Sequence, residues 1–133
     1  MVKWNERETT IYGDMIEAKA RTAIINYYNV EIKNITDDET HKINIYDFET
    51  TNDIKYEVKG DRLSIKTGNF YIEYSAFNKP SGISISTANI WMLLYGESFY
   101  CISSDELKKL CRKYKDKKAC CNFETIGYLI PVK

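Results

Sequence analysis

Apolar residues recur at steps of three and four positions near the start of the chain. Tyr12, Met15, Ile16 and Tyr27 fall on one side of a helix, and the alanines between them favour a helical backbone. We therefore expect the first element to be a helix over about residues 6–27.

Apolar and polar residues then alternate in short runs, which is typical of strands with one buried face. Five strands are expected, over residues 29–35, 42–50, 54–59, 69–75 and 98–102. Thr51-Asn52-Asp53 predicts a tight turn between two of them, and Lys79-Pro80-Ser81-Gly82 predicts a second turn.

Two further helices are predicted in the second half of the chain. Ser86 or Thr87 can cap a helix that includes residues 88–95, ANIWMLLY. Ser103 or Ser104 can cap a charged helix over residues 105–115. Glu106 stands three residues after Ser103, the spacing of a capping box.

The tail of the chain, residues 126–132, reads as an edge strand because Pro131 cannot donate to a ladder. This order of elements predicts an α/β or α+β fold. We expect a mixed β-sheet flanked by helices, in a single domain over residues 1–133.

The composition is that of a folded protein, with 44% hydrophobic and 29% charged residues. A net charge of zero argues against tight non-specific DNA binding but leaves room for a local basic patch. No apolar run reaches the length of a membrane span and the N-terminus is too polar for a signal peptide, so we expect no membrane partner. We expect a cytoplasmic protein, in the host cell if the chain is viral. The four cysteines form no C-x-x-C pair, which argues against a zinc site and favours reduced thiols.

The hairpin around residues 51–53 brings candidate chemistry together. With a three-residue loop, residue 50 lies opposite residue 54 and Asp47 lies opposite Glu57. Directly opposed side chains share a face, with Cβ atoms about 5 Å apart. Lys59 lies on the same face as Glu57 because side chains alternate along a strand. A two-residue loop would instead separate the two carboxylates.

The face that carries Asp47 is expected to be half-buried because Ile43 and Ile45 share it. Two close carboxylates there repel each other and require a proton or a cation. Mg²⁺ suits such a pair, and the ammonium of Lys59 can orient a water or stabilise charge on a phosphate. The alternative is a solvated strand face with cross-strand ion pairs, which is the better explanation for Glu-x-Lys taken alone.

A longer stretch of sequence is more specific than this short motif. Its matching segments are Asp47, Tyr56-Glu57-Val58-Lys59, Asp61, Thr67-Gly68-Asn69, Ile72-Glu73-Tyr74, Lys79-Pro80-Ser81-Gly82-Ile83, and Thr87-Ala88 with Trp91. Together they resemble small phage- and virus-type nucleases of the PD-(D/E)XK superfamily, over about a third of the chain. One position departs from the pattern, since relatives usually carry Asp where Asn89 stands.

The resemblance implies a restriction-endonuclease-like core and a nuclease that depends on Mg²⁺ or Mn²⁺. It implies that Asp47, Glu57 and the carbonyl of Val58 bind the metal and that Lys59 acts on the nucleophile. By the same resemblance, Glu17 on the first helix adds a ligand or orients a metal-bound water.

Glu17 also has two ordinary structural explanations. Asp14 and Glu17 fit a helix capping box, and Glu17 has the spacing for an ion pair with Arg21. The sequence leaves the catalytic and the structural alternatives open.

Two sets of residues are candidates for DNA contacts. Ser81, Gly82 and Thr87 could hold a phosphate at a helix N-terminus, although turn and cap roles fit them equally well. The basic residues of the last helix could contact the phosphate backbone. They are Lys108, Lys109, Arg112 and Lys113. A solvated helix end, where cations are favoured by the helix dipole, is the alternative.

The function predicted from the sequence is a metal-dependent endonuclease that hydrolyses phosphodiester bonds in DNA. At this size it is expected to recognise a DNA structure, as a junction resolvase does, or to act as a homodimer. Two alternatives stay open. One is an inactive nuclease-fold protein that binds nucleic acid in the same groove, and the other is a viral structural or interaction protein.

Overall fold

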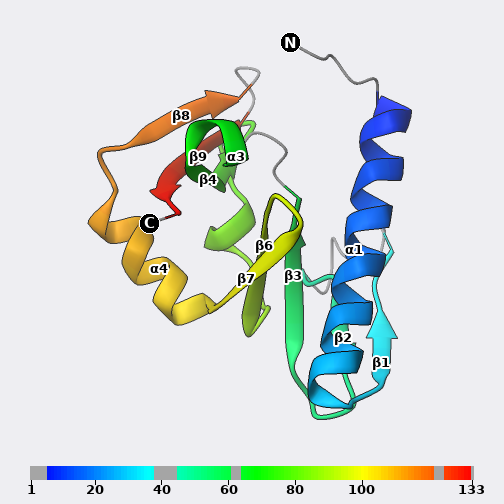
Figure 1. Ribbon diagram of the computed structural model, residues 1–133. Helices are drawn as coiled ribbons and strands as arrows, with labels where there is room; N and C mark the ends of the chain where they lie inside the picture. Colours follow the sequence, from blue (N-terminus) through cyan, green and yellow to red (C-terminus); the bar gives the residue numbers. More distant parts are fainter. Residues whose placement is uncertain (1–5, 38–44, 61–63, 122–124, 133) are drawn as a thin grey trace.

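The computed structural model describes residues 6–37, 45–60, 64–121 and 125–132 (Figure 1). The first described element is helix α1 (Glu6–Tyr28), which agrees with the predicted first helix. Among the described residues, no helix combines the length and the apolar character that crossing a membrane requires.

Two β-sheets follow α1. In chain order the other elements of the described residues are β1 (Ile32–Ile35), β2 (Phe48–Thr50), β3 (Lys55–Lys59), α3 (Ser64–Thr67), β4 (Asn69–Ala76), β5 (Lys79–Pro80), the 3₁₀ turn η1 (Gly82–Ser84), β6 (Ile90–Tyr95), β7 (Ser98–Ser103), α4 (Ser104–Lys113), β8 (Lys118–Cys121) and β9 (Thr125–Pro131).

The five-stranded sheet, called sheet A, has the strand order β1-β2-β3-β6-β7. Strands β3 and β6 pair in parallel and the other neighbouring strands pair antiparallel, so sheet A is mixed. The four-stranded sheet, called sheet B, has the order β5-β4-β9-β8 and is antiparallel. The structure is therefore a mixed α+β protein, in general agreement with the predicted class.

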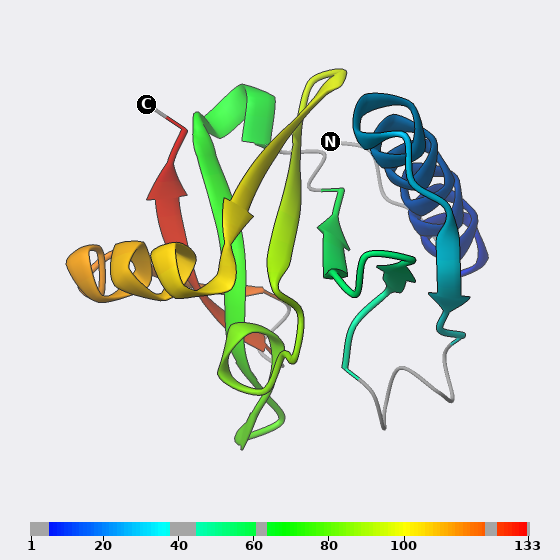
Figure 2. The same ribbon diagram turned by 90° about the horizontal axis from the view of Figure 1, so that it is seen from below.

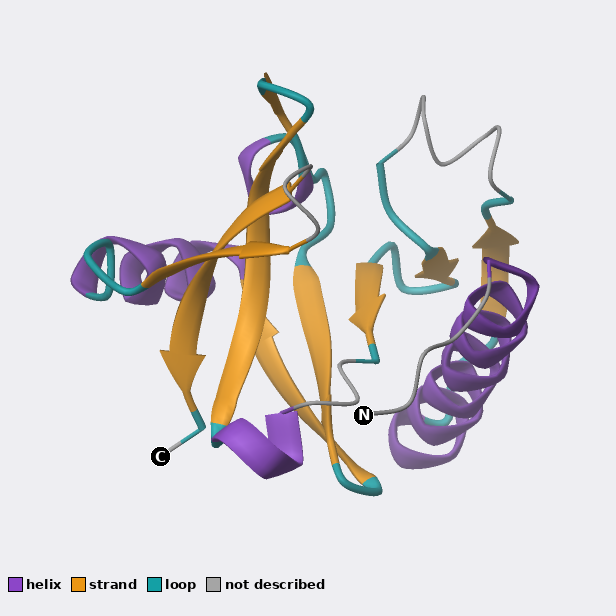
Figure 3. Ribbon diagram, turned by 90° about the horizontal axis from the view of Figure 1, so that it is seen from above, coloured by secondary structure: helices purple, strands orange, loops and turns teal. Residues whose placement is uncertain are grey.

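The molecule is layered around sheet A (Figures 2 and 3). On one face, the buried side of α1 packs against residues of β2, β3 and β6. On the other face, residues of β6 pack against sheet B and α4, with Trp91 entirely buried among them. This alternation places Tyr56 and Val58 under α1, which leaves Glu57 and Lys59 on the face toward sheet B.

The predicted hairpin register is confirmed. Phe48 pairs with Tyr56 and Glu49 pairs with Lys55, and the N–H of Thr50 donates to the carbonyl of Ile54 at 3.0 Å. The charged helix is confirmed as α4, and its N-cap is Ser103, whose hydroxyl accepts from the N–H of Glu106 at 3.2 Å. The strand at residues 98–102 is confirmed as β7.

The helix expected through residues 88–95 is wrong, because Ile90–Tyr95 is strand β6. Four consecutive residues of β6 are buried, since the strand is an interior strand of sheet A and is covered on both faces. A strand buried on both faces is apolar throughout and loses the alternation that identifies strands in sequence. Consequently Ser86 and Thr87 cap no helix.

The turn expected at Lys79–Gly82 is also wrong. The chain reverses at Phe77 and Asn78, which both adopt positive φ angles (51° and 63°), and Lys79–Pro80 then forms β5. Asn tolerates this left-handed conformation well. The Pro-Ser-Gly sequence is typical of a turn, but it follows the actual reversal of the chain.

The tail was expected to be an edge strand, but β9 lies inside sheet B, between β4 and β8. Pro131 is tolerated because it is the last residue of β9. The short strand β8, which covers the outer side of β9, was not predicted.

Strands β1 and β2 are both shorter than expected. The first begins only at Ile32, since Asn29 has a φ angle of 54°. The second is limited to Phe48–Thr50 in the described residues, and Ile45 lies outside it with a φ angle of 59°. The expectation that Ile45 continues the Asp47 face of a strand is therefore wrong, while Ile43 lies outside the described residues.

Candidate functional site

The structure brings the carboxyl groups of Asp47 and Glu57 together. Asp47 directly precedes β2, and its N–H donates to the carbonyl of Tyr56 at 2.8 Å. Its Oδ2 accepts from the N–H of Val58 at 2.7 Å. The side chains of Asp47 and Glu57 are hydrogen-bonded to each other, and Glu57 is buried. Two acids that are ten positions apart in sequence thus form one pair.

This pair holds a proton at neutral pH. Burial, the hydrogen bond to Glu57 and the negative charges of Glu57 and Glu17 raise the pKa of Asp47 to about 9. The hydrogen bond from Val58 lowers this pKa but does not offset the other effects. Two carboxylates in a poorly solvated site cannot both stay ionised unless a cation compensates them.

Glu17 reaches the same pair from α1. Its side chain is hydrogen-bonded to Asp47. Burial raises the pKa of Glu17, although the Asp47 hydrogen bond and the positive charge of Arg21 act in the opposite direction. Glu17 lies near Asp47 and also interacts with Arg21, so the catalytic and the ion-pair explanations both stay open. The capping-box explanation is wrong, because Asp14 and Glu17 lie inside α1 rather than at its start. No described group of three or more His, Cys, Asp or Glu side chains is arranged to hold a metal ion as it stands.

Lys59 lies two residues beyond Glu57 on the same face of β3. Its Nζ is 5.6 Å from the centre of the Trp91 ring, within the range of a cation–π contact. Burial lowers the pKa of Lys59, but nearby carboxylates outweigh it and the pKa is raised. In order of effect they are Glu57, Asp47, Glu73 and Glu17. The side chain is therefore an ammonium held beside the acidic pair.

Glu73 was assigned no part in the predicted site, yet it contributes to the charge around Lys59. It comes from β4 in sheet B and accepts a hydrogen bond at 2.8 Å from the hydroxyl of Ser81. Gly82, with a φ angle of 52°, lies so close that a Cβ there would overlap the carbonyl oxygen of Glu73. Ser81 and Gly82 thus lie beside Glu73, and their contacts are those of structural supports.

The helix N-terminus at which Ser81, Gly82 and Thr87 could hold a phosphate is not formed, so of the two alternatives the ordinary turn roles fit these residues better. After Ser81 the chain makes only the three-residue 3₁₀ turn η1, and Thr87 precedes a strand. The N–H and the hydroxyl of Thr87 both donate to the carbonyl of Ile45, at 3.1 Å and 3.3 Å. Thr87 therefore anchors the segment that leads into Asp47.

The basic residues of α4 are exposed, and the contacts found for them are local to that helix. Lys109 forms an ion pair with Glu106 at 3.3 Å, and the Nζ of Lys113 lies 5.4 Å from the centre of the Tyr114 ring. Lys108 and Arg112 also lie on the exposed side. The structure does not bring these side chains into the acidic pair.

Asn89, which directly precedes β6, and Trp91 of β6 lie next to the strand that carries Glu57 and Lys59. The Oδ1 of Asn89 accepts from the N–H of Lys55 at 2.8 Å, and the N–H of Asn89 donates to the carbonyl of Lys55 at 2.8 Å. Asn89 thus fixes the start of the parallel pair of strands. Trp91 pairs with Glu57 across that ladder, and its indole N–H has no hydrogen-bond partner within the described part of the chain.

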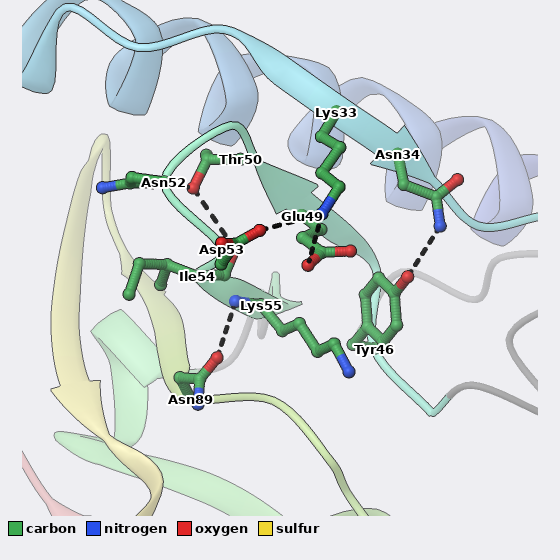
Figure 4. Close-up of polar contacts among 10 residues, drawn as sticks. All are labelled: Lys33, Asn34, Tyr46, Glu49, Thr50, Asn52, Asp53, Ile54, Lys55 and Asn89. Carbon is green, nitrogen blue, oxygen red and sulfur yellow. Dashed lines mark hydrogen bonds and ion pairs between the residues drawn. The ribbon is translucent and has the colours of Figure 1, made fainter.

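Further polar contacts lie along the hairpin that joins β2 to β3, and together they form a polar surface (Figure 4). Lys55 shares a strand face with Glu57 and Lys59, and its Nζ lies 5.1 Å from the centre of the Tyr46 ring. The hydroxyl of Tyr46 accepts from Asn34 at 2.7 Å.

Lys33, also drawn in Figure 4, belongs to the same polar surface. Its ammonium is engaged by Asp53 at 2.8 Å and by Glu49 at 3.7 Å. Lys55 is therefore the cation of this surface that is better placed to meet a ligand.

The sequence predicted roles for Asp47, Glu57, Lys59 and Glu17. Glu73 and Trp91 were noted only as residues of the resembling stretch and Lys55 was not singled out. The first group lies on α1 and one local hairpin, whereas Glu73 comes from the other sheet. No protein-family model, no curated protein and no solved structure matches the chain.

Proposed function

We propose that this protein is a divalent-metal-dependent endonuclease with a restriction-endonuclease-like core, which hydrolyses phosphodiester bonds in DNA. One observation carries the proposal. The buried carboxyl of Glu57 and the half-buried carboxyl of Asp47 contact each other beside the ammonium of Lys59, a grouping that is electrostatically unfavourable without an additional cation.

The donor set fits a hard divalent cation. Asp47 and Glu57 offer carboxylate oxygens, and Mg²⁺ commonly uses one or two carboxylates and fills its remaining positions with water and phosphate oxygens. The pair shares a proton in the absence of a metal, and a bound cation would replace that proton. We propose Asp47, Glu57 and the Val58 carbonyl as ligands, with Mg²⁺ or Mn²⁺ as the metal. When bound, such an ion polarises the phosphate and makes water a stronger nucleophile.

Lys59 supplies a fixed positive charge. Its ammonium can donate hydrogen bonds to a non-bridging phosphate oxygen or to the attacking water, and its burial strengthens that interaction. The contact with Trp91 restricts where the ammonium can lie. Glu17, hydrogen-bonded to Asp47, is placed to accept a hydrogen bond from a water in the site.

DNA contacts are proposed for two surfaces. Lys55 lies on the same strand face as the acidic pair and can neutralise a phosphate adjacent to the scissile one. The exposed cations of α4 can add sequence-independent affinity, which would make binding sensitive to salt. A chain of this size is proposed to recognise a DNA structure, such as a junction, rather than a long sequence.

A second candidate function is a nuclease-fold protein that binds nucleic acid without cutting it. It is favoured by the absence, among the described residues, of three or more side chains preassembled as metal ligands. The two functions differ in one outcome, because only the first produces DNA cleavage that depends on the metal.

The deciding experiment offers the protein single-stranded, duplex and branched DNA, with and without Mg²⁺ or Mn²⁺. We expect the metal to be required, and we expect Glu57→Gln to abolish cleavage while DNA binding persists. Glu49→Gln is the matched control, since Glu49 lies on the same hairpin but contacts Lys33 rather than Asp47. Binding of DNA without cleavage of any substrate would favour the second candidate.

A further inference from the structure

Three of the four edge strands in the two sheets carry features that block the addition of another strand. β1 is short, contains Lys33 and has an irregular register. β5 has only two residues, Lys79 and Pro80. β8 has four residues and begins with Lys118. Short length, lysine, proline and irregular register are the usual means of protecting a sheet edge.

The fourth edge strand, β7, carries none of these features. Its six residues, Ser98–Ser103, read SFYCIS and include neither a charge nor a proline. All six residues of β6, Ile90 to Tyr95, pair with the six residues of β7 in a regular antiparallel ladder, and no described strand pairs with the outer side of β7. Tyr100 and Cys101 are exposed.

An apolar cavity adjoins each face of β7. On the α1 side a cavity of about 520 Å³ is lined by residues that include Ile24, Tyr27, Tyr28, Met92 and Phe99. On the other side a cavity of about 230 Å³ is lined by residues that include Phe70, Leu93, Tyr100 and Leu107. An added strand would project alternate side chains to both faces, and such paired pockets are what strand addition uses.

We propose that β7 is a dimerisation edge, at which a second copy of this chain adds its own β7 in antiparallel orientation. Antiparallel pairing of a strand with itself is self-complementary about a two-fold axis. Because β7 is uncharged, the pairing opposes no like charges, and the net charge of zero adds no repulsion between copies.

The side-chain alternation also selects a register. Directly opposed residues must share a face, so a two-fold axis at Cys101 sets Cys101 against its copy and Tyr100 against Ile102. Aromatic and β-branched side chains form favourable cross-strand pairs. The resulting sheet would continue through both copies, with the two α1 helices on the same face.

This proposal is independent of the proposed nuclease function, because it uses neither the acidic pair nor Lys59. The full chain is examined by sedimentation equilibrium over a range of concentrations. We expect a species of twice the 15.6 kDa chain mass, and we expect Cys101→Lys to raise the dimer dissociation constant about tenfold or more, since it opposes two ammonium groups.

Ile35→Lys is the matched control, because it makes an equivalent change on the exposed edge strand β1 and should leave the dimer intact. A monomer at every concentration would overturn the proposal and leave the edge to an extended segment of another protein. It would also be overturned if folded Cys101→Lys still dimerised, or if Ile35→Lys dissociated equally.

A second measurement does not depend on a variant that folds. Directly opposed Cα atoms in an antiparallel pair lie about 4.5–5.5 Å apart, inside the range of a disulfide. Mild oxidation of the wild-type protein should therefore link Cys101 to Cys101 of a second copy, as read by peptide mass mapping. A dimer in which this link never forms would contradict the proposed register.

Discussion

At the scale of single residues, the site depends on how tightly Asp47 holds a proton. Its pKa is about 9 in the folded protein, far above the ordinary value of 3.8. The folded state therefore binds a proton that the unfolded state releases between these two values. The free energy of unfolding contributed by Asp47 must fall as the pH rises through that window.

Asp47→Asn should consequently stabilise the metal-free protein. The amide can still accept from the N–H of Val58 and can donate to Glu57, as the protonated acid does. We expect a gain on the order of 2 kcal/mol at pH 8 and little change at pH 4, measured by thermal unfolding with a chelator present. Equal effects at both pH values would contradict the shared proton.

Lys59 and Lys55 lie on one strand face but should affect different kinetic constants. Lys59→Ala removes a charge beside the reacting phosphate, so kcat should fall about 10²- to 10³-fold with KM little changed. Lys55→Ala removes a contact to a remote phosphate, so KM should rise while kcat persists. Steady-state kinetics on the cleaved substrate separates the two, and a loss of kcat in both variants would count against this assignment.

At the scale of elements, the hairpin was predictable because its chemistry is local. Turn residues and side-chain alternation determine the register that joins Asp47 to Glu57. Strand β6 was not predictable as a strand, since it is apolar on both faces and resembles a buried helix segment. Glu73 was not predictable as a neighbour of Lys59 because it belongs to β4, a strand of the other sheet.

Two glycines with positive φ offer an element-scale test: Gly82 begins η1, and Gly68 lies between α3 and β4. A Cβ at Gly82 would overlap the Glu73 carbonyl, whereas no atom lies within 4 Å of a Cβ at Gly68. Gly82→Ala should therefore cost about 2–4 kcal/mol of unfolding free energy, against about 1 kcal/mol for Gly68→Ala. Equal losses in chemical denaturation would mean that Gly82 is not packed on β4 as described.

At the scale of the whole molecule, sheet A separates two packing layers. α1 covers one face and sheet B covers the other (Figure 2). Glu17 of α1 is hydrogen-bonded to Asp47, and Glu73 of β4 contributes to the charge around Lys59. The sequence predicted the mixed class but not sheet B as a separate layer, because strand pairing between distant segments leaves no local signal. The site thus combines a residue from each of the two layers with residues of sheet A.

The central claim is that Asp47 and Glu57 form a divalent-metal site, and calorimetric titration with Mn²⁺ tests it most directly. At pH 8 the wild-type protein should bind the ion and release protons as the shared proton is displaced. Glu57→Gln should lose this binding and Glu49→Gln should keep it. Wild-type protein that binds no Mn²⁺, or Glu57→Gln that binds it equally well, would contradict the claim.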